Sequence, residues 1–155
     1  MSRFVFSLAA ATLALSAPAL AQDEAADTAT QAILAALGEG YVEADLSNGA
    51  RQFRRCQSCH TLNEGGRNTV GPNLWGIVGA PAAYNETFNY SRPLSESGLV
   101  WDAATLDSWI ENPRAMVPGN RMSFVGLRDA AARRDVIAYL AVETTAQDAA
   151  SVVSE

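Results

Sequence analysis

The stretch Cys56-Gln57-Ser58-Cys59-His60 decides how the rest of this sequence is interpreted. Two cysteines three positions apart, followed at once by a histidine, form the C-x-x-C-H signature for covalent attachment of a c-type haem. A step of three residues on one helical turn brings both sulfurs to one edge of the haem, where each thiol can add to a vinyl group. The adjacent imidazole then lies under the iron and can bind it from one side. Cys56 and Cys59 are the only cysteines, and His60 is the only histidine.

Other kinds of site share part of this signature. A bare C-x-x-C also occurs in redox disulfides and in zinc sites. Structural zinc sites usually have four ligands, and the chain has only two cysteines and one histidine. A thioredoxin-like site has a strand before it and an α/β pattern around it, and neither pattern is found here. Haem attachment is therefore the prediction, and a chance occurrence of the signature is the remaining alternative.

The beginning of the chain has the pattern of a signal peptide covering residues 1–21. Arg3 gives it a positive start, residues 4–20 are apolar, and Ala19-Leu20-Ala21 is an A-x-A cleavage site. The alternative is an uncleaved membrane anchor, but the apolar run is short for a membrane span. No later segment is apolar enough to cross a membrane. We therefore expect export and cleavage after Ala21, which leaves the length of one domain.

Charge divides the remaining chain into three parts. Residues 22–45 carry six acidic residues and no basic one, and we predict a flexible acidic extension, with disorder over 23–30 and a short helix over 32–37. Residues 46–142 carry ten arginines and eight acidic residues, and they form the predicted domain. Residues 143–155 are predicted to be a loose tail. A nearly balanced domain charge argues against a nucleic-acid binder.

Local signals predict a mostly α-helical domain without strands. A first helix is expected from about Ser47, as its N-cap, to about Cys56. A second begins after Asp102 as N-cap and ends before Pro113. A last helix over 129–142 has a broad apolar stripe. A domain of about a hundred residues with this many loops buries little apolar surface of its own, and a haem packed between the loops would complete the core.

The second axial ligand of the iron can be approached by elimination. The chain has no second histidine and no lysine, and both thiols are committed to the vinyl groups. Met1 leaves with the signal peptide, so Met116 and Met122 remain. A thioether favours ferrous iron and raises the reduction potential. The alternative is that both methionines only fill the core, which is the usual role of this residue.

The order of short motifs along residues 46–142 resembles that of class I cytochromes c, close to mitochondrial cytochrome c and its bacterial periplasmic relatives. Besides the haem signature, these motifs are Gly49 and Phe53, Gly71-Pro72-Asn73-Leu74-Trp75-Gly76, Phe88-Asn89-Tyr90, Trp101, Asn112-Pro113, Val117-Pro118-Gly119-Asn120-Arg121-Met122 and Asp135-Val136-Ile137-Ala138-Tyr139-Leu140. The resemblance implies an all-α fold of about three to five helices wrapped around one haem c, bound covalently through Cys56 and Cys59.

The resemblance also implies roles for single residues around the iron. The P-G-x-x-M motif makes Met122, rather than Met116, the axial ligand opposite His60. The carbonyl of Pro72 would accept a hydrogen bond from the other ring nitrogen of His60 and fix the orientation of the ring.

Tyr90 and Trp101 match the two family positions that hydrogen-bond a buried haem propionate. Two positions depart from the pattern. Trp109 stands where relatives often have a tyrosine near the axial methionine, and Ala80 stands where they often have an arginine near a propionate.

The function that the resemblance implies is that of a soluble, periplasmic, monomeric electron carrier and not of an enzyme. It would carry one electron at a time between membrane complexes, such as a cytochrome bc complex and a terminal oxidase or photosynthetic reaction centre. We expect no stable membrane insertion and no nucleic-acid partner. Arginines near the haem-contacting segments are predicted to ring the exposed haem edge and attract acidic partners. They are Arg51, Arg54, Arg55, Arg67, Arg114 and Arg121.

Two other functions remain open at this point. A haem enzyme or a gas-binding sensor would need Met122 to be absent from the iron or displaceable. A haem domain tethered to a membrane complex would need the leader to be retained.

Overall fold

The computed structural model of the chain describes residues 19–151. The predicted signal peptide therefore lies almost wholly outside the described residues. Within 19–151 the chain forms six α-helices and one 3-10 helix. The described part contains no strand, and a single isolated bridge pairs Pro81 with Val100. The predicted all-α fold is confirmed.

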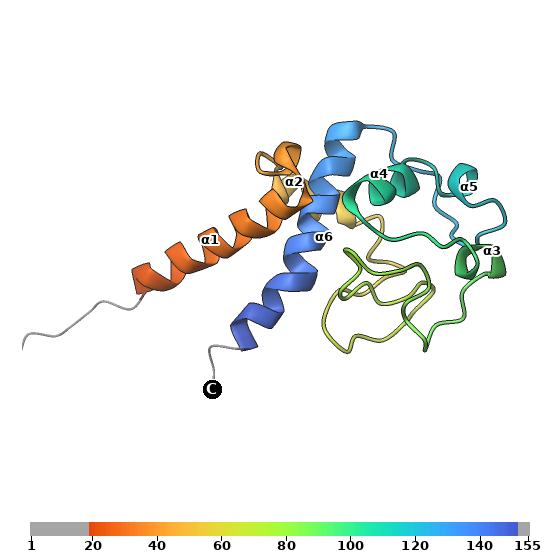
Figure 1. The fold of residues 1–155 in the computed structure, drawn as a ribbon, viewed down its shortest axis with the longest axis horizontal. Coiled ribbons are helices and arrows are strands. Elements are labelled where there is room, and N and C mark those ends of the chain that lie inside the picture. The colour runs from red at the N-terminus through yellow and green to blue at the C-terminus, as the bar shows by residue number, and fades with distance from the viewer. Residues whose placement is uncertain (1–18, 152–155) are drawn as a thin grey trace, which may run out of the picture.

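Helices α2 (Leu46–Phe53) and α6 (Ala130–Ser151) cross at the centre of the molecule (Figure 1). The crossing is close because Gly49 has no side chain there: a Cβ would lie 2.6 Å from the Cβ of Tyr139. The rings of Phe53 and Tyr139 pack with their centroids 5.8 Å apart. In this view α1 lies on one side of α6, and the loops with α3, α4 and α5 lie on the other.

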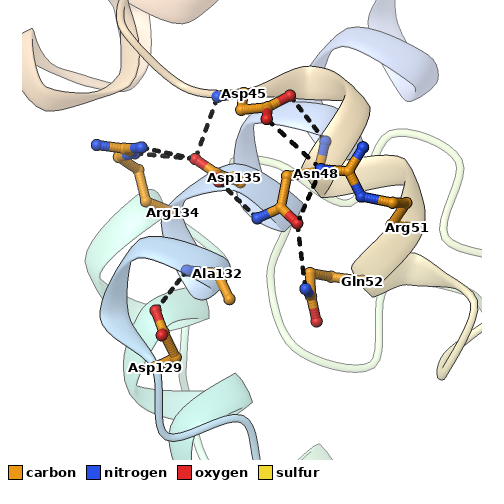
Figure 2. Close-up of polar contacts among 8 residues, drawn as sticks. All are labelled: Asp45, Asn48, Arg51, Gln52, Asp129, Ala132, Arg134 and Asp135. Carbon is orange, nitrogen blue, oxygen red and sulfur yellow. Dashed lines mark hydrogen bonds and ion pairs between the residues drawn. The ribbon is translucent and has the colours of Figure 1, made fainter.

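A buried carboxylate fastens the beginning of α2 to α6 (Figure 2). Asp135, whose side chain is 5% exposed, accepts hydrogen bonds from the Asp45 backbone at 3.2 Å and from Asn48 Nδ2 at 2.8 Å. Arg134 donates to the same carboxylate at 2.8 Å. Burial raises the pKa of Asp135, but the hydrogen bonds from Asn48 and Arg134 more than offset it, so the pKa lies below its ordinary value.

The beginning of α2 differs from the prediction. The N-cap is Asp45 and not Ser47, because the Asp45 carboxylate accepts the backbone N–H of Asn48 at 2.8 Å. The N-cap therefore lies two residues earlier than predicted, and the helix starts at Leu46. Both residues are good caps, and the contact of Asp45 with α6 fixes which of them is used.

Three short helices lie between the two crossing helices in the sequence. Helix α4 (Ala103–Glu111) begins after Asp102, as predicted, and the Asp102 carboxylate accepts from Thr105 N at 2.7 Å. Helices α3 (Arg92–Ser95) and α5 (Pro113–Met116) were not predicted. Each has a proline in its first turn, where the missing N–H costs no hydrogen bond.

The segment predicted to be a flexible acidic extension is helical in the structure, as α1 (Ala19–Leu37) and the 3-10 helix η1 (Glu39–Tyr41). Its alanine-rich composition favours a helix, and its end packs on the domain: Leu34 is only 2% exposed, and α1 contacts α6. The predicted loose tail is also helical up to Ser151, as a continuation of α6. Among the described residues, no helix has both the length and the apolar character that crossing a membrane requires.

Candidate haem-binding site

The loops and helices enclose a cavity of about 570 Å³. Every residue predicted to hold the cofactor lines it: Cys56, Cys59, His60, Pro72, Tyr90, Trp101 and Met122. Apolar side chains form much of the remaining wall, among them Leu74, Ile77, Leu94, Leu106, Ile110 and Leu140. The fold therefore brings together segments that lie far apart in the sequence around one apolar space.

The two cysteines lie on a helix-like turn that follows α2. Backbone N–H groups of Cys59 and His60 both donate to the carbonyl of Cys56 at 2.9 Å. Both thiols are free, and burial raises the pKa of Cys56 to about 11. A thiol that stays protonated at neutral pH is a poor redox nucleophile, so the arrangement does not favour a thioredoxin-like site.

His60 is held with one ring nitrogen available to a metal. Its Nδ1 lies 2.7 Å from the carbonyl oxygen of Pro72. A carbonyl can only accept, so Nδ1 carries the hydrogen and Nε2 keeps its lone pair. Burial lowers the pKa of His60, although the bond to Pro72 opposes this effect. The neutral imidazole, which is the form that binds metals, is therefore favoured.

The structure separates the two candidate methionines. Met122 lines the cavity, whereas Met116, at the end of α5, is absent from its described lining. Asn120 holds the backbone near Met122: its Nδ2 donates to the carbonyls of Pro113 and Val117, both at 2.8 Å, and its Oδ1 accepts from Met122 N at 2.9 Å. Met122 thus approaches the cavity from a fixed turn.

Part of the cavity wall is polar. Tyr90 and Trp101 line the cavity, and so does Ser91, which was not predicted from the sequence. Ser91 Oγ is buried and has no hydrogen-bond partner among the described residues. Burial raises the pKa of Tyr90, with a backbone hydrogen bond to Asn85 opposing it, so its hydroxyl remains a donor. A mainly apolar cavity with an unsatisfied polar atom in its wall fits a flat apolar ring that carries carboxylate groups.

The sequence of this chain is similar to those of known cytochromes c, which agrees with a haem-binding site. No protein-family model matches the chain. Cytochrome c2 of Rhodomicrobium vannielii is 44% identical over 103 residues, which is 66% of this chain and 82% of that protein. Cytochrome c of Stellaria longipes is 40% identical over 102 residues, 65% of this chain and 94% of that protein.

One solved structure is similar to this chain in both sequence and fold. Cytochrome cH from Methylobacterium extorquens is 40% identical, with a TM-score of 0.59, and the match covers 63% of this chain and 97% of that one.

The chain belongs to the class I cytochrome c family.

At the level of the family, this cytochrome is a monohaem electron carrier rather than an enzyme. Its departures from the family's pattern have clear local consequences. Ala80 offers only its backbone, whose carbonyl accepts the N–H of Trp101 at 2.8 Å. Trp109 is 8% exposed, lines the cavity and packs against Trp101 with ring centroids 5.2 Å apart. The larger indole thus adds apolar wall where relatives often have a hydroxyl.

The arginines of this cytochrome are distributed less evenly than predicted. All six named arginines are exposed, but only Arg55 and Arg121 among them line the cavity. Arg121 Nη2 donates to the carbonyl of Asn89 and so bridges two edges of the cavity. Arg51 instead pairs with Asp45 at the beginning of α2, at 3.6 Å. Val70, which is 79% exposed, also belongs to the lining, so the open edge combines positive charge with an apolar side chain.

Proposed function

We propose that this cytochrome binds one haem c covalently through Cys56 and Cys59, with His60 Nε2 and the sulfur of Met122 as axial ligands. The observation that carries the proposal is that both thiols, the free ring nitrogen and one thioether line the same apolar cavity. When bound, the haem supplies the one-electron redox chemistry.

The protein's own residues set the conditions for that chemistry. Pro72 holds the His60 ring in one tautomer and one orientation, which increases the donor strength of Nε2. The thioether of Met122 favours the ferrous state. Apolar walls such as Leu106 and Trp109 keep water away from the iron. Together these effects favour outer-sphere electron transfer over binding of a substrate.

The proposed setting is the periplasm, after removal of residues 1–21, and the proposed partners are a cytochrome bc complex and a terminal oxidase or photosynthetic reaction centre. The exposed Arg55, Val70 and Arg121 all line the cavity, and together they form a surface suited to an acidic partner face with an apolar centre. Such charges mainly raise association rates and are weakened by salt.

The test is a spectrum and a mass of the purified holoprotein. We expect the haem to stay with the polypeptide in acidic organic solvent. The mass should correspond to a chain whose first residue is Gln22. The ferric spectrum should be low-spin, with the weak methionine–iron charge-transfer band. A high-spin ferric spectrum would instead support the haem enzyme or gas-binding sensor. A mass that includes residues 1–21 would support the tethered domain.

Partner binding is tested by stopped-flow reduction and oxidation with candidate complexes at increasing salt. We expect the second-order rates to fall steeply as ionic strength rises. Rates that do not depend on salt would contradict the proposed role of the arginines.

A further inference from the structure

Arg133 is a buried cation that makes no contact with the cavity described above. It lies in the first turns of α6, and its side chain is 7% exposed. Its Nε and Nη2 donate to the two carboxylate oxygens of Asp107 at 2.8 and 3.2 Å. Its Nη1 donates to the carbonyls of Leu127 and Arg128 at 3.1 and 2.8 Å. Nη1 also lies 3.5 Å from a carboxylate oxygen of Glu111, so the guanidinium joins two acidic residues of α4 to two backbone carbonyls just before α6.

Those carbonyls belong to the methionine segment, residues 117–129, which runs without helix from α5 to α6 and carries Met122. The first end of this segment is fixed by Asn120, which bonds to Pro113 and Val117. The second end lies on α4, where Leu127 N donates to the carbonyl of Ile110 at 2.9 Å. Gly126 permits the approach, because a Cβ there would lie 3.0 Å from the carbonyl carbon of Glu111.

The second end lies close to Met122 in the sequence. Four residues separate Met122 from Leu127, and two of them, Ser123 and Phe124, also line the cavity. Each residue spans at most about 3.6 Å, so the position of Leu127 limits how far Met122 can move from it. The hydrogen bonds that hold Leu127 and Arg128 therefore restrict where the Met122 thioether can go.

We propose that Arg133 is a positioning residue for Met122. By holding the carbonyls of Leu127 and Arg128 against α4, it sets the fraction of molecules in which the methionine segment has swung away from the iron. The proposal rests on the proposed function, in which Met122 is an axial ligand. It assigns to the paired Arg133 and Asp107 a role in coordination as well as in helix packing.

Lysine cannot reproduce this arrangement. An ammonium group is a point charge with three donors on a flexible chain, whereas guanidinium presents a rigid fork that meets a carboxylate with two bonds. Arg133→Lys keeps the charge opposite Asp107 but cannot hold both Asp107 oxygens and the two loop carbonyls at once. The variant is therefore expected to fold with a looser second end of the methionine segment.

The neighbouring Arg134 provides a matched control. Its side chain donates to Asp135 at the junction of α6 with α2 (Figure 2). Arg134→Lys makes the same chemical change one position along the same helix. It can lower stability through α2, but it does not touch Leu127 or Arg128.

The experiment titrates ferric holoprotein with imidazole and follows the loss of the methionine–iron band. Imidazole binds only the open form, so its apparent affinity rises with the open fraction. Loss of a charge-assisted hydrogen bond is expected to increase the affinity of Arg133→Lys about tenfold, and that of Arg134→Lys less than about twofold. Equal affinities for Arg133→Lys and the wild type, or equal increases in both variants, would overturn the proposal.

Two further variants keep the outcome decisive. If Arg133→Lys does not retain haem, Asp107→Asn weakens the same contact from α4, and an imidazole affinity unchanged from the wild type would reject the proposal. Met122→Ala tests the proposed function separately. A wild-type methionine–iron band in Met122→Ala would show that the axial assignment is wrong. If Met122→Ala loses the band but Arg133→Lys has the imidazole affinity of the wild type, only the role of Arg133 is rejected.

Discussion

Gly71 lies flat against the imidazole of His60, so closely that a Cβ at Gly71 would sit 2.8 Å from Nδ1. The same Nδ1 is bonded to the carbonyl of Pro72, the next residue in the chain. One short turn thus fixes both the plane and the tautomer of the ring. Glycine is required here for contact with a side chain and not for a left-handed backbone.

Gly71→Ala is expected to displace the His60 ring. Overpacking at a close contact costs about 1–3 kcal/mol, so the thermal midpoint should fall, and the low-spin spectrum should weaken as the iron loses its histidine. Thermal melts and optical spectra of the holoprotein measure both effects. Gly40→Ala is the control, since no atom lies within 4 Å of a Cβ there. Wild-type behaviour of Gly71→Ala would contradict the placement of the ring.

Met122→Ala should remove the methionine–iron band and lower the reduction potential, because a soft ligand that favours ferrous iron is lost. Met116→Ala should leave the band in place, since Met116 does not line the cavity as described. Optical spectroscopy and potentiometric titration make the comparison. The axial assignment is wrong if Met116→Ala alone abolishes the band.

Leu34→Ala should destabilise the protein without changing the haem spectrum. Leu34 is 2% exposed on α1, outside the haem cavity, and truncation of a buried leucine costs about 2–5 kcal/mol. Chemical denaturation measures the free energy of unfolding. Val42→Ala is the control, because Val42 is 39% exposed and should change the stability little.

A chain that begins at Glu43 should likewise keep a low-spin haem but unfold at lower denaturant. The deletion removes α1 and η1 but keeps Asp45, which caps α2 and bonds to Asp135. A truncated chain that cannot retain a low-spin haem would refute the view that the extension supports the fold rather than the site.

Asn48→Ala should make the protein more sensitive to acid. The pKa of Asp135 is lowered in the folded state by bonds that include the one from Asn48. The stability from such a group is complete above its unfolded pKa of about 3.9 and is lost as the pH falls through the folded pKa. Removing one bond raises the folded pKa of Asp135, so the variant should unfold at a higher pH.

Circular dichroism during an acid titration checks this. Arg92→Ala, which breaks only an exposed pair with Glu96, should leave the midpoint unchanged. Identical acid midpoints for Asn48→Ala and the wild type would argue against the role of the Asp135 cluster.

Met122 should stay bound to a higher pH than the axial methionine of relatives that have a lysine in the same loop. This chain has no lysine, and the guanidinium of Arg121, beside Met122, has no acceptor atom with which to bind iron. Displacement should therefore occur by hydroxide. Paramagnetic resonance of the ferric protein during an alkaline titration shows the ligand, and a nitrogen-ligated form that persists without residues 22–42 would disprove the argument.

The sequence predicted the parts of this fold that depend on neighbouring residues. Asp102 caps α4 because the cap and the amide it binds are three positions apart, and Cys56 to His60 work within one turn. The roles of Ser91, Gly71 and Arg133 were not predicted, because each depends on partners brought close only by the folded chain. For the same reason, composition alone suggested disorder where α1 is fixed by packing on α6.

The crossing of α2 and α6 also has a consequence for the order in which the protein is made. The bond between Asn48 and Asp135 joins residues 87 positions apart, so α2 and the cysteines leave the ribosome well before their packing partner exists. Until α6 arrives, Cys56 and Cys59 stand on an unfinished surface that an attachment machinery can reach. Under the proposed function, haem can therefore be joined to the exported chain before the last helix packs and closes the fold over it.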